Sequence, residues 1–192
     1  MIVGLGNPGR EYVHTRHNAG FEVMSLLEAH YGVTLGRKML GGLLTEIWTE
    51  ERKIVLCAPQ TFMNASGECV VRLLKWYHAE PDHLLVIYDD IDLPPGTVRM
   101  RRSGGPGTHN GMRSIVECID SQAFPRLRVG TGDRPAGEDL VSWVLGRPAA
   151  GEEQECMERA FALASVCAVD WAENGIDHAM RLCAEKGKED KQ

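Results

Sequence analysis

Short apolar runs alternate along this chain with stretches whose apolar residues recur every three or four positions. The short runs predict buried strands, and the longer spacing predicts amphipathic helices. A chain that forms strands and helices in turn builds a single α/β domain around a central sheet. Its 192 residues are also enough for one domain with a substantial core.

Individual elements follow from the same patterns. The predicted strands are residues 2–4, 43–49, 53–57, 84–88, 97–101 and 127–129, of which the second and third form a hairpin. The predicted helices are residues 21–31, 70–77, 115–119 and a long helix that follows Gly151 and is closed by Asn174 and Gly175. A short final helix precedes charged residues that we expect to be frayed. We therefore expect one folded domain at residues 1–184 and a tail at 185–192.

Composition excludes several classes of protein. Hydrophobic residues make up 43% of the chain and charged residues 25%, which is the balance of a globular protein rather than a disordered one. No apolar run is long enough to cross a bilayer, and the N-terminus lacks the pattern of a secretion signal. The six cysteines are widely spaced without a C-x-x-C motif, which favours reduced thiols. These features predict a cytoplasmic protein without membrane contact.

Charge is distributed unevenly along the chain. The formal net charge is -6, yet residues 99–128 hold six arginines against Glu117 and Asp120, so this segment carries +4 and the remainder -10. The six are Arg99, Arg101, Arg102, Arg113, Arg126 and Arg128. Because phosphate responds to local charge, such a segment suits a compact anionic contact. Arginines on a solvated face fit the pattern equally well.

The segment G-L-G-N-P-G at residues 4–9 matches the dinucleotide-binding pattern G-x-G-x-x-G. That function requires a helix that opens at the third glycine and an acidic residue about 20 positions later, at the end of a second strand. Here a polar stretch follows Gly9, and Glu28 falls inside a predicted helix. Pro8 also removes an amide that would face the phosphates. A nicotinamide-dependent oxidoreductase is therefore only an alternative.

Polar side chains gather at the ends of predicted strands and before predicted helices. They are Asn7, His17, Asn18, Asn64, Asp89, His109 and Asn110. In open α/β sheets, ligands bind beyond the carboxyl ends of the strands, where residues distant in sequence meet. Each residue also has an ordinary interpretation, since asparagine and aspartate suit helix caps and turns and His17 suits the surface. Taken one at a time, the ordinary interpretations are favoured.

Four segments that carry these residues resemble those of bacterial peptidyl-tRNA hydrolases, in the same order. They are G-L-G-N-P-G-R-E-Y with T-R-H-N-A-G-F, then P-Q-T-F-M-N-A-S-G, then D-D-I-D-L-P-P-G, and then G-T-H-N-G. The similarity extends to V-L-G-R-P at residues 144–148, and only the last two helices match weakly. The resemblance implies a single domain with a mixed, twisted central sheet flanked by helices, the phosphorylase/hydrolase-like fold. It also implies an enzyme without metal or cofactor that hydrolyses the ester between a peptide, or an N-acylated amino acid, and the terminal ribose of tRNA.

The resemblance further implies roles for single residues. The expected catalytic residues are His17, Asp89, Asn7, Asn64 and Asn110, and the expected substrate-binding residues are Tyr12, Phe62, Met63, Asn64, Asn110, Arg99, Arg101 and Arg128. His17 would take a proton from water, and Asp89 would fix its tautomer. Neutral amides would donate to the oxyanion without adding charge beside the histidine. No G-x-S-x-G motif occurs, so water is the expected nucleophile.

The implied partner is peptidyl-tRNA, whose acceptor end and 5′-phosphate would contact Arg101 and Arg128, with assistance from Arg99 and Arg102. No obligate protein partner is implied, and the expected state is a monomer. Residues 132–143 correspond to a lid, and their Gly and Pro content suits a mobile flap.

One departure from the family pattern lies before His109, where Thr108 stands in place of the usual glycine and Pro106 lies upstream. If that position requires a positive φ, threonine strains the loop that carries Asn110. The placement of this asparagine is therefore the least secure part of the resemblance.

Two other classes stay open. A metal-dependent hydrolase would use Asp89, Asp90 and Asp92 with His14, His17 or His109, although no zinc motif such as H-E-x-x-H occurs. A non-catalytic RNA-binding module would use the same arginines, although the chain has no aromatic stacking motif.

Overall fold

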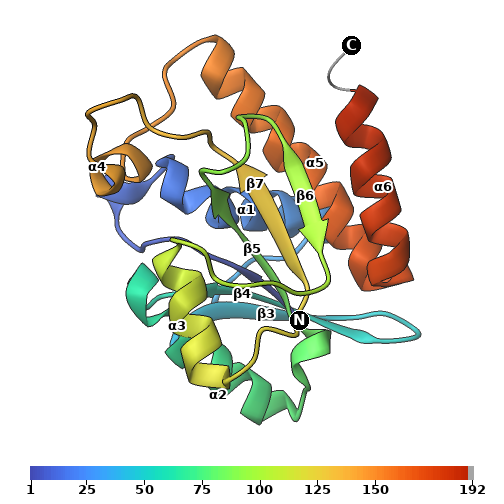
Figure 1. The fold of residues 1–192 in the computed structure, drawn as a ribbon. Coiled ribbons are helices and arrows are strands. Elements are labelled where there is room, and N and C mark those ends of the chain that lie inside the picture. Colours follow the sequence, from blue (N-terminus) through green and yellow to red (C-terminus); the bar gives the residue numbers. More distant parts are fainter. Residues whose placement is uncertain (190–192) are drawn as a thin grey trace.

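The computed structural model describes residues 1–189 as a mixed seven-stranded sheet with helices on both faces (Figure 1). The strands are β1 (Ile2–Gly4), β2 (Arg37–Met39), β3 (Gly42–Trp48), β4 (Lys53–Pro59), β5 (Leu85–Asp90), β6 (Val98–Arg101) and β7 (Arg126–Gly130). Their order across the sheet is β2-β3-β4-β1-β5-β7-β6. Strands β4, β1, β5 and β7 run parallel, whereas β2, β3 and β6 are antiparallel to their neighbours. The predicted single α/β domain with a mixed sheet is confirmed.

Each face of the sheet has its own core. The helices are α1 (Ala19–Tyr31), α2 (Ser66–Tyr77), α3 (Asn110–Ile119), α4 (Leu140–Val144), α5 (Glu152–Asn174) and α6 (Ile176–Glu189), and the 3-10 helices are η1 (Arg10–Tyr12), η2 (Arg16–Asn18), η3 (Met63–Ala65) and η4 (Pro81–His83). Successive strand residues point to opposite faces. Ile2, Leu85 and Ile87 pack against α1, α5 and α6, whereas Val3 and Val86 pack against α2 and α3.

Most predicted elements are confirmed, with bounds that shift by a few residues. The hairpin is present as β3 and β4, and the helix expected at 115–119 begins five residues earlier, at Asn110. Besides the 3-10 helices, one strand and one α-helix were not predicted, β2 at the sheet edge and the five-residue helix α4. Neither is long enough to show a period. Helix α4 begins after Asp139, whose carboxylate accepts a hydrogen bond from the N–H of Ser142.

Helix α6 continues to Glu189. Residues 185–189 thus continue a helix that Ala179 and Cys183 anchor in the core, and the expected fraying of the tail at residues 185–192 stays a prediction. Residues 190–192 lie outside the described residues. Across residues 1–189, no helix combines the length and the apolar composition that a membrane crossing needs.

The glycines of residues 4–9 serve close packing. A Cβ on Gly4 would lie 2.4 Å from the carbonyl oxygen of Gly20, and one on Gly6 would lie 2.6 Å from the ring of Phe21. The loop leads into η1, and α1 opens only at Ala19. Because no α-helix starts at the third glycine, the dinucleotide-binding alternative is wrong.

Gly67 sets the distance between α2 and α3. Its N–H donates to Ser114 Oγ at 2.9 Å, and a Cβ at this position would lie 2.1 Å from the carbonyl oxygen of Ser114. Since η3 leads into α2 and Asn110 begins α3, this contact fixes the spacing of two segments that carry predicted site residues.

Replacing Gly67 with alanine should destabilise the protein by about 1–3 kcal/mol, the usual cost of overpacking, and so outweigh the gain in helix propensity of about 1 kcal/mol. Thermal unfolding followed by circular dichroism measures the change. Gly36→Ala is the control, because the nearest atom to a Cβ there is 4.0 Å away. An unchanged melting temperature in Gly67→Ala would mean that the two helices separate without cost.

Candidate active site

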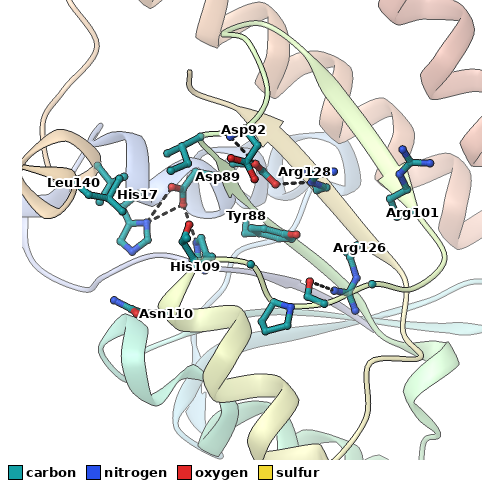
Figure 2. A pocket seen from close by; sticks show the side chains of 18 of the residues that line it. His17, Tyr88, Asp89, Asp92, Arg101, His109, Asn110, Arg126, Arg128 and Leu140 are labelled. Atoms are coloured by element: carbon teal, nitrogen blue, oxygen red, sulfur yellow. Dashed lines mark hydrogen bonds and ion pairs between the residues drawn. The ribbon is translucent and has the colours of Figure 1, made fainter. Parts of the chain in front are cut away.

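The carboxyl end of β5, the helix η2 and the loop before α3 surround a cavity of about 320 Å³ (Figure 2). His17, Asp89 and Asn110 line it, together with arginines of β6 and β7. Apolar residues of α4, including Leu140, form a further wall. This is the edge at which an open α/β sheet binds ligands, as the sequence predicted.

His17 and Asp89 form a buried hydrogen-bonded pair. His17 Nδ1 lies 2.9 Å from Asp89 Oδ1 and 3.1 Å from Oδ2. Burial by itself lowers the pKa of His17, but the adjacent carboxylate of Asp89 outweighs it and raises that pKa above the ordinary value. Within residues 1–189 no side chain or backbone group bonds to Nε2, so this nitrogen is available to a ligand.

Asp89 accepts a second hydrogen bond from His109, whose Nε2 lies 3.0 Å from Oδ1. His109 Nδ1 accepts from the N–H of Met112 at 3.2 Å, so that nitrogen carries no proton and Nε2 must be the donor. Burial raises the pKa of a carboxyl group, yet His17 and His109 together hold the pKa of Asp89 well below its usual range. The sequence placed His109 among the polar side chains that precede predicted helices, but the expected catalytic and substrate-binding residues did not include it.

Asn7 and Asn18 hold each other in place, and neither is among the residues that line the cavity. The N–H of Asn7 donates to Asn18 Oδ1 at 2.8 Å, and Asn18 Nδ2 donates to the carbonyl oxygen of Asn7 at 3.0 Å. Asn7 Oδ1 accepts from the N–H of Met63 at 2.8 Å. Because a backbone N–H can only donate, this contact identifies the amide oxygen and leaves Nδ2 as the free donor. The sequence placed Asn18 among the polar side chains that precede predicted helices, but no catalytic or binding role was assigned to it.

Asn64 and Asn110 are not helix caps, so that ordinary interpretation is wrong. His109 caps α3, and α2 has no side-chain cap. Asn110 lines the cavity, whereas Asn64 is exposed on η3 outside the lining. A Cβ on Gly111 would lie 2.6 Å from Met63 Sδ, so η3 packs directly against the start of α3.

Tyr12 and Phe62 lie beside η3 and also stand outside the cavity lining. Their rings meet edge to face with centroids 6.4 Å apart, and Phe62 is 58% exposed. An exposed phenyl ring of this kind can pack against a flat apolar part of a ligand. Of the predicted substrate-binding residues, only Asn110, Arg101 and Arg128 line the cavity. The others lie outside its lining, namely Tyr12, Phe62, Met63, Asn64 and Arg99.

Four arginines project from one face of the antiparallel pair β6 and β7. The register sets Arg99 opposite Arg128 and Arg101 opposite Arg126, and residues directly opposite point to the same face. The alternate residues of both strands pack into the core on the other face. The arginines therefore share the face of the sheet that packs against α2 and α3 around Val86, but this part of that face carries charge beside the cavity.

These arginines differ in their freedom to meet an anion. Arg126 is 1% exposed and donates to the carbonyl oxygens of Gly105 and Gln122, so it holds a loop together. Arg128 Nε lies 2.5 Å from Asp90 Oδ2. Arg99 and Arg101 are exposed, and in the described part of the chain neither forms an ion pair. Arg102 is paired with Asp177.

The residues considered for a metal site from sequence only partly meet. His17, Asp89 and His109 have ligand atoms within 4.8 Å of one another, and no other such group occurs in residues 1–189. His14 instead contacts Glu22, and Asp90 pairs with Arg128. The larger acidic set is therefore not assembled.

The loop before α3 accommodates Thr108 without strain. The left-handed position of this loop is Gly107, with a φ of 58°, and Thr108 is not among the non-glycine residues with positive φ. The expected strain is therefore absent, and Asn110 reaches the cavity wall.

Comparison with known proteins agrees with this geometry. The family model described as peptidyl-tRNA hydrolase matches residues 1–191. The chain is 44% identical over 183 residues to the peptidyl-tRNA hydrolase of Syntrophomonas wolfei, covering 94% of this chain and 97% of that protein. Its identity to the enzyme of Alkaliphilus metalliredigens is also 44%, with 94% and 96% covered. The crystal structure of peptidyl-tRNA hydrolase from Acinetobacter baumannii matches with a TM-score of 0.88 at 38% identity, over 95% of this chain and 92% of that one. This chain therefore belongs to the peptidyl-tRNA hydrolase family.

Proposed function

We propose that His17 is the general base with which this chain, as a peptidyl-tRNA hydrolase, cleaves the ester between the peptide and the terminal ribose of tRNA. The hydrogen bond from His17 Nδ1 to Asp89 at the cavity wall carries the proposal. It keeps the proton on Nδ1 and leaves Nε2 able to take one from water. The family supplies the substrate class.

The reaction proceeds without a covalent enzyme intermediate. Water attacks the carbonyl carbon of the ester as its proton passes to His17 Nε2, and the carbonyl oxygen takes up the negative charge. Asp89 stabilises the imidazolium as it forms. The intermediate then collapses by breaking its bond to the ribose oxygen, which receives the proton from Nε2. The peptide leaves as a carboxylic acid and the tRNA with a free ribose hydroxyl.

Neutral amides bind the reacting group and the peptide. We assign the oxyanion and the nearest peptide carbonyl to Asn7 Nδ2 and to Asn110, since these donors add no charge beside His17. Asn64 and the pair Tyr12 and Phe62 would hold the part of the substrate that extends beyond the cavity. Uncharged partners suit an N-acylated amino acid better than a free ammonium, whose burial would go uncompensated.

The tRNA side of the substrate is assigned to the arginine face of β6 and β7. Arg101 and Arg128 would contact the 5′-phosphate of the acceptor end, and Arg99 would assist. In this scheme the protein acts as a monomer without a cofactor or an obligate protein partner, as the resemblance implies. The six cysteines are all free thiols, which fits a cytoplasmic location.

Replacing His17 with alanine should lower kcat by roughly 10²-fold or more, the usual contribution of a general base, while the Kd for deacylated tRNA stays near that of the wild type. Turnover of N-acetylated aminoacyl-tRNA measures the effect. The control is His83→Ala, a histidine with a side chain that is 74% exposed. Near-normal turnover of His17→Ala would remove this residue from the reaction.

Replacing Asp89 with asparagine should shift the acid limb of the kcat/KM profile to lower pH. In the wild type, activity falls as pH drops through the pKa of His17, which the carboxylate of Asp89 raises. Without that charge the pKa of His17 falls, so the acid limb moves to lower pH. The maximal rate also falls, because the imidazolium that forms in the reaction loses the carboxylate that stabilises it.

A second pair of the same type provides the control for this profile. His178 Nδ1 lies 2.8 Å from Asp170 Oδ2 between α5 and α6, so Asp170→Asn removes a similar contact far from the cavity. Its acid limb should coincide with that of the wild type. An unmoved limb in Asp89→Asn would mean that the limb does not report His17.

Replacing Arg101 with alanine should weaken binding of all tRNA species alike and reduce the slope of log Kd against log salt by about one, since a phosphate contact releases counterions without reading bases. Arg128→Ala should change the slope less, because Asp90 already balances that charge. Arg72→Ala, an exposed arginine paired with Glu68 on α2, is the control. A changed preference among tRNAs at constant salt slope would contradict the phosphate assignment.

A further inference from the structure

Arg16 directly precedes His17, yet its side chain takes no part in the hydrogen bonds of the His17 and Asp89 pair. It is 4% exposed, which is rare for an arginine and requires partners for its charge and its donors. These partners come from residues 143–153, which lie far along the chain.

Every nitrogen of the Arg16 guanidinium donates. Nε and Nη2 donate to Glu153 Oε1, at 3.1 Å and 2.6 Å. Nη1 donates to the carbonyl oxygens of Trp143, at 3.3 Å, and Arg147, at 3.1 Å. The guanidinium also lies 3.6 Å from the centre of the Trp143 ring. One side chain thus joins η2 to the first turn of α5 and to the C-terminal end of α4.

Surrounding bonds strengthen this junction. The N–H of Arg16 donates to the carbonyl oxygen of Gly146 at 3.0 Å, and Arg147 Nε donates to the carbonyl oxygen of Val13 at 3.1 Å. Trp143 Nε1 donates to the carbonyl oxygen of Gly132 at 3.1 Å, which ties the two ends of the segment 132–143 together. By contrast, residues 133–139 between them are exposed.

The junction matters to the cavity because α4 forms one of its walls. Leu140, Val141 and Val144 line the cavity, and Val141 is 57% exposed. Figure 2 shows Leu140 at the same end of the cavity as His17. A five-residue helix is not stable by itself, so the position of this apolar wall depends on what holds its ends.

We propose that Arg16 is a positioning residue that fixes the apolar wall of α4 relative to His17, so that the acyl part of the substrate is held against the base. The proposal rests on the proposed function for its substrate. The anchoring itself requires only the contacts of Arg16 with α4 and α5.

The test is Arg16→Lys, which keeps a positive charge opposite Glu153 but lacks the fork that serves Glu153, Trp143 and Arg147 at once. KM for N-acetylated aminoacyl-tRNA should rise on the order of tenfold, with kcat within about twofold, because the wall binds substrate and takes no part in proton transfer. The acid limb of the pH profile should stay in place. Amide hydrogen exchange should become faster in peptides that cover residues 140–147 and stay unchanged in those that cover α2 and α3.

The matched control is Arg52→Lys. Arg52 Nη1 also donates to two backbone carbonyl oxygens, those of Ala172 at 2.7 Å and Glu173 at 2.9 Å, but it lines no part of the active-site cavity. This variant should leave KM and exchange at residues 140–147 unchanged. If Arg16→Lys does not fold, Trp143→Leu, which removes the stacked ring and the bond to Gly132, should give the same pattern.

Two outcomes would overturn the proposal. Unchanged exchange at residues 140–147 would show that Arg16 does not hold α4. A fall in kcat with a displaced acid limb and an unchanged KM would show that Arg16 acts on His17 instead. Hydrogen exchange needs no turnover, so the anchoring is tested even if the wild type fails to hydrolyse peptidyl-tRNA, a result that would count against the proposed function alone.

Discussion

Asp89 is the penultimate residue of β5 and has 2% of its surface exposed. A carboxylate so buried loses hydration that only hydrogen bonds or opposite charge can replace. Two imidazole N–H groups replace this hydration, and both donate a hydrogen bond to Asp89 Oδ1. His17 comes from η2 ahead of α1, whereas His109 comes from the cap of α3. Because α1 packs on one face of the sheet and α3 on the other, the carboxylate joins the two layers at the edge where the cavity lies.

The two histidines differ in what their second nitrogen does. Nδ1 of His109 accepts from the backbone of α3, so this ring has one hydrogen-bonding state in which both partners are satisfied. Nε2 of His17 has no partner among residues 1–189 and faces the cavity. In the proposed reaction one ring therefore fixes the carboxylate and the other moves the proton. Two similar residues around one charge take different roles because only one of them also caps a helix.

The sequence predicted the alternation of strands and helices because apolar periodicity reports burial directly. It also predicted the edge of the sheet at which His17 and Asp89 meet, although their roles came from resemblance to a family. Helix α4 escaped prediction since five residues show no period. The contact of His109 with Asp89 was not predicted, because the position of a histidine before a helix does not show which carboxylate its side chain will contact. The burial of Arg126 was not predicted either, because a count of charged residues does not show which of them have hydrogen-bond partners in the core.

Burial and pairing also change the meaning of the +4 charge of residues 99–128. Arg126 is buried, Arg128 is paired with Asp90 and Arg102 with Asp177, so Arg99 and Arg101 hold much of the charge that is open to a ligand beside the cavity. Each phosphate contact adds affinity that is indifferent to sequence and persists in the released tRNA. An enzyme in the proposed role acts on every tRNA and must release each one after cleavage. A few free arginines, with neighbours already neutralised by aspartates, would meet both demands of the proposed function, because they would orient the acceptor end without retaining the product.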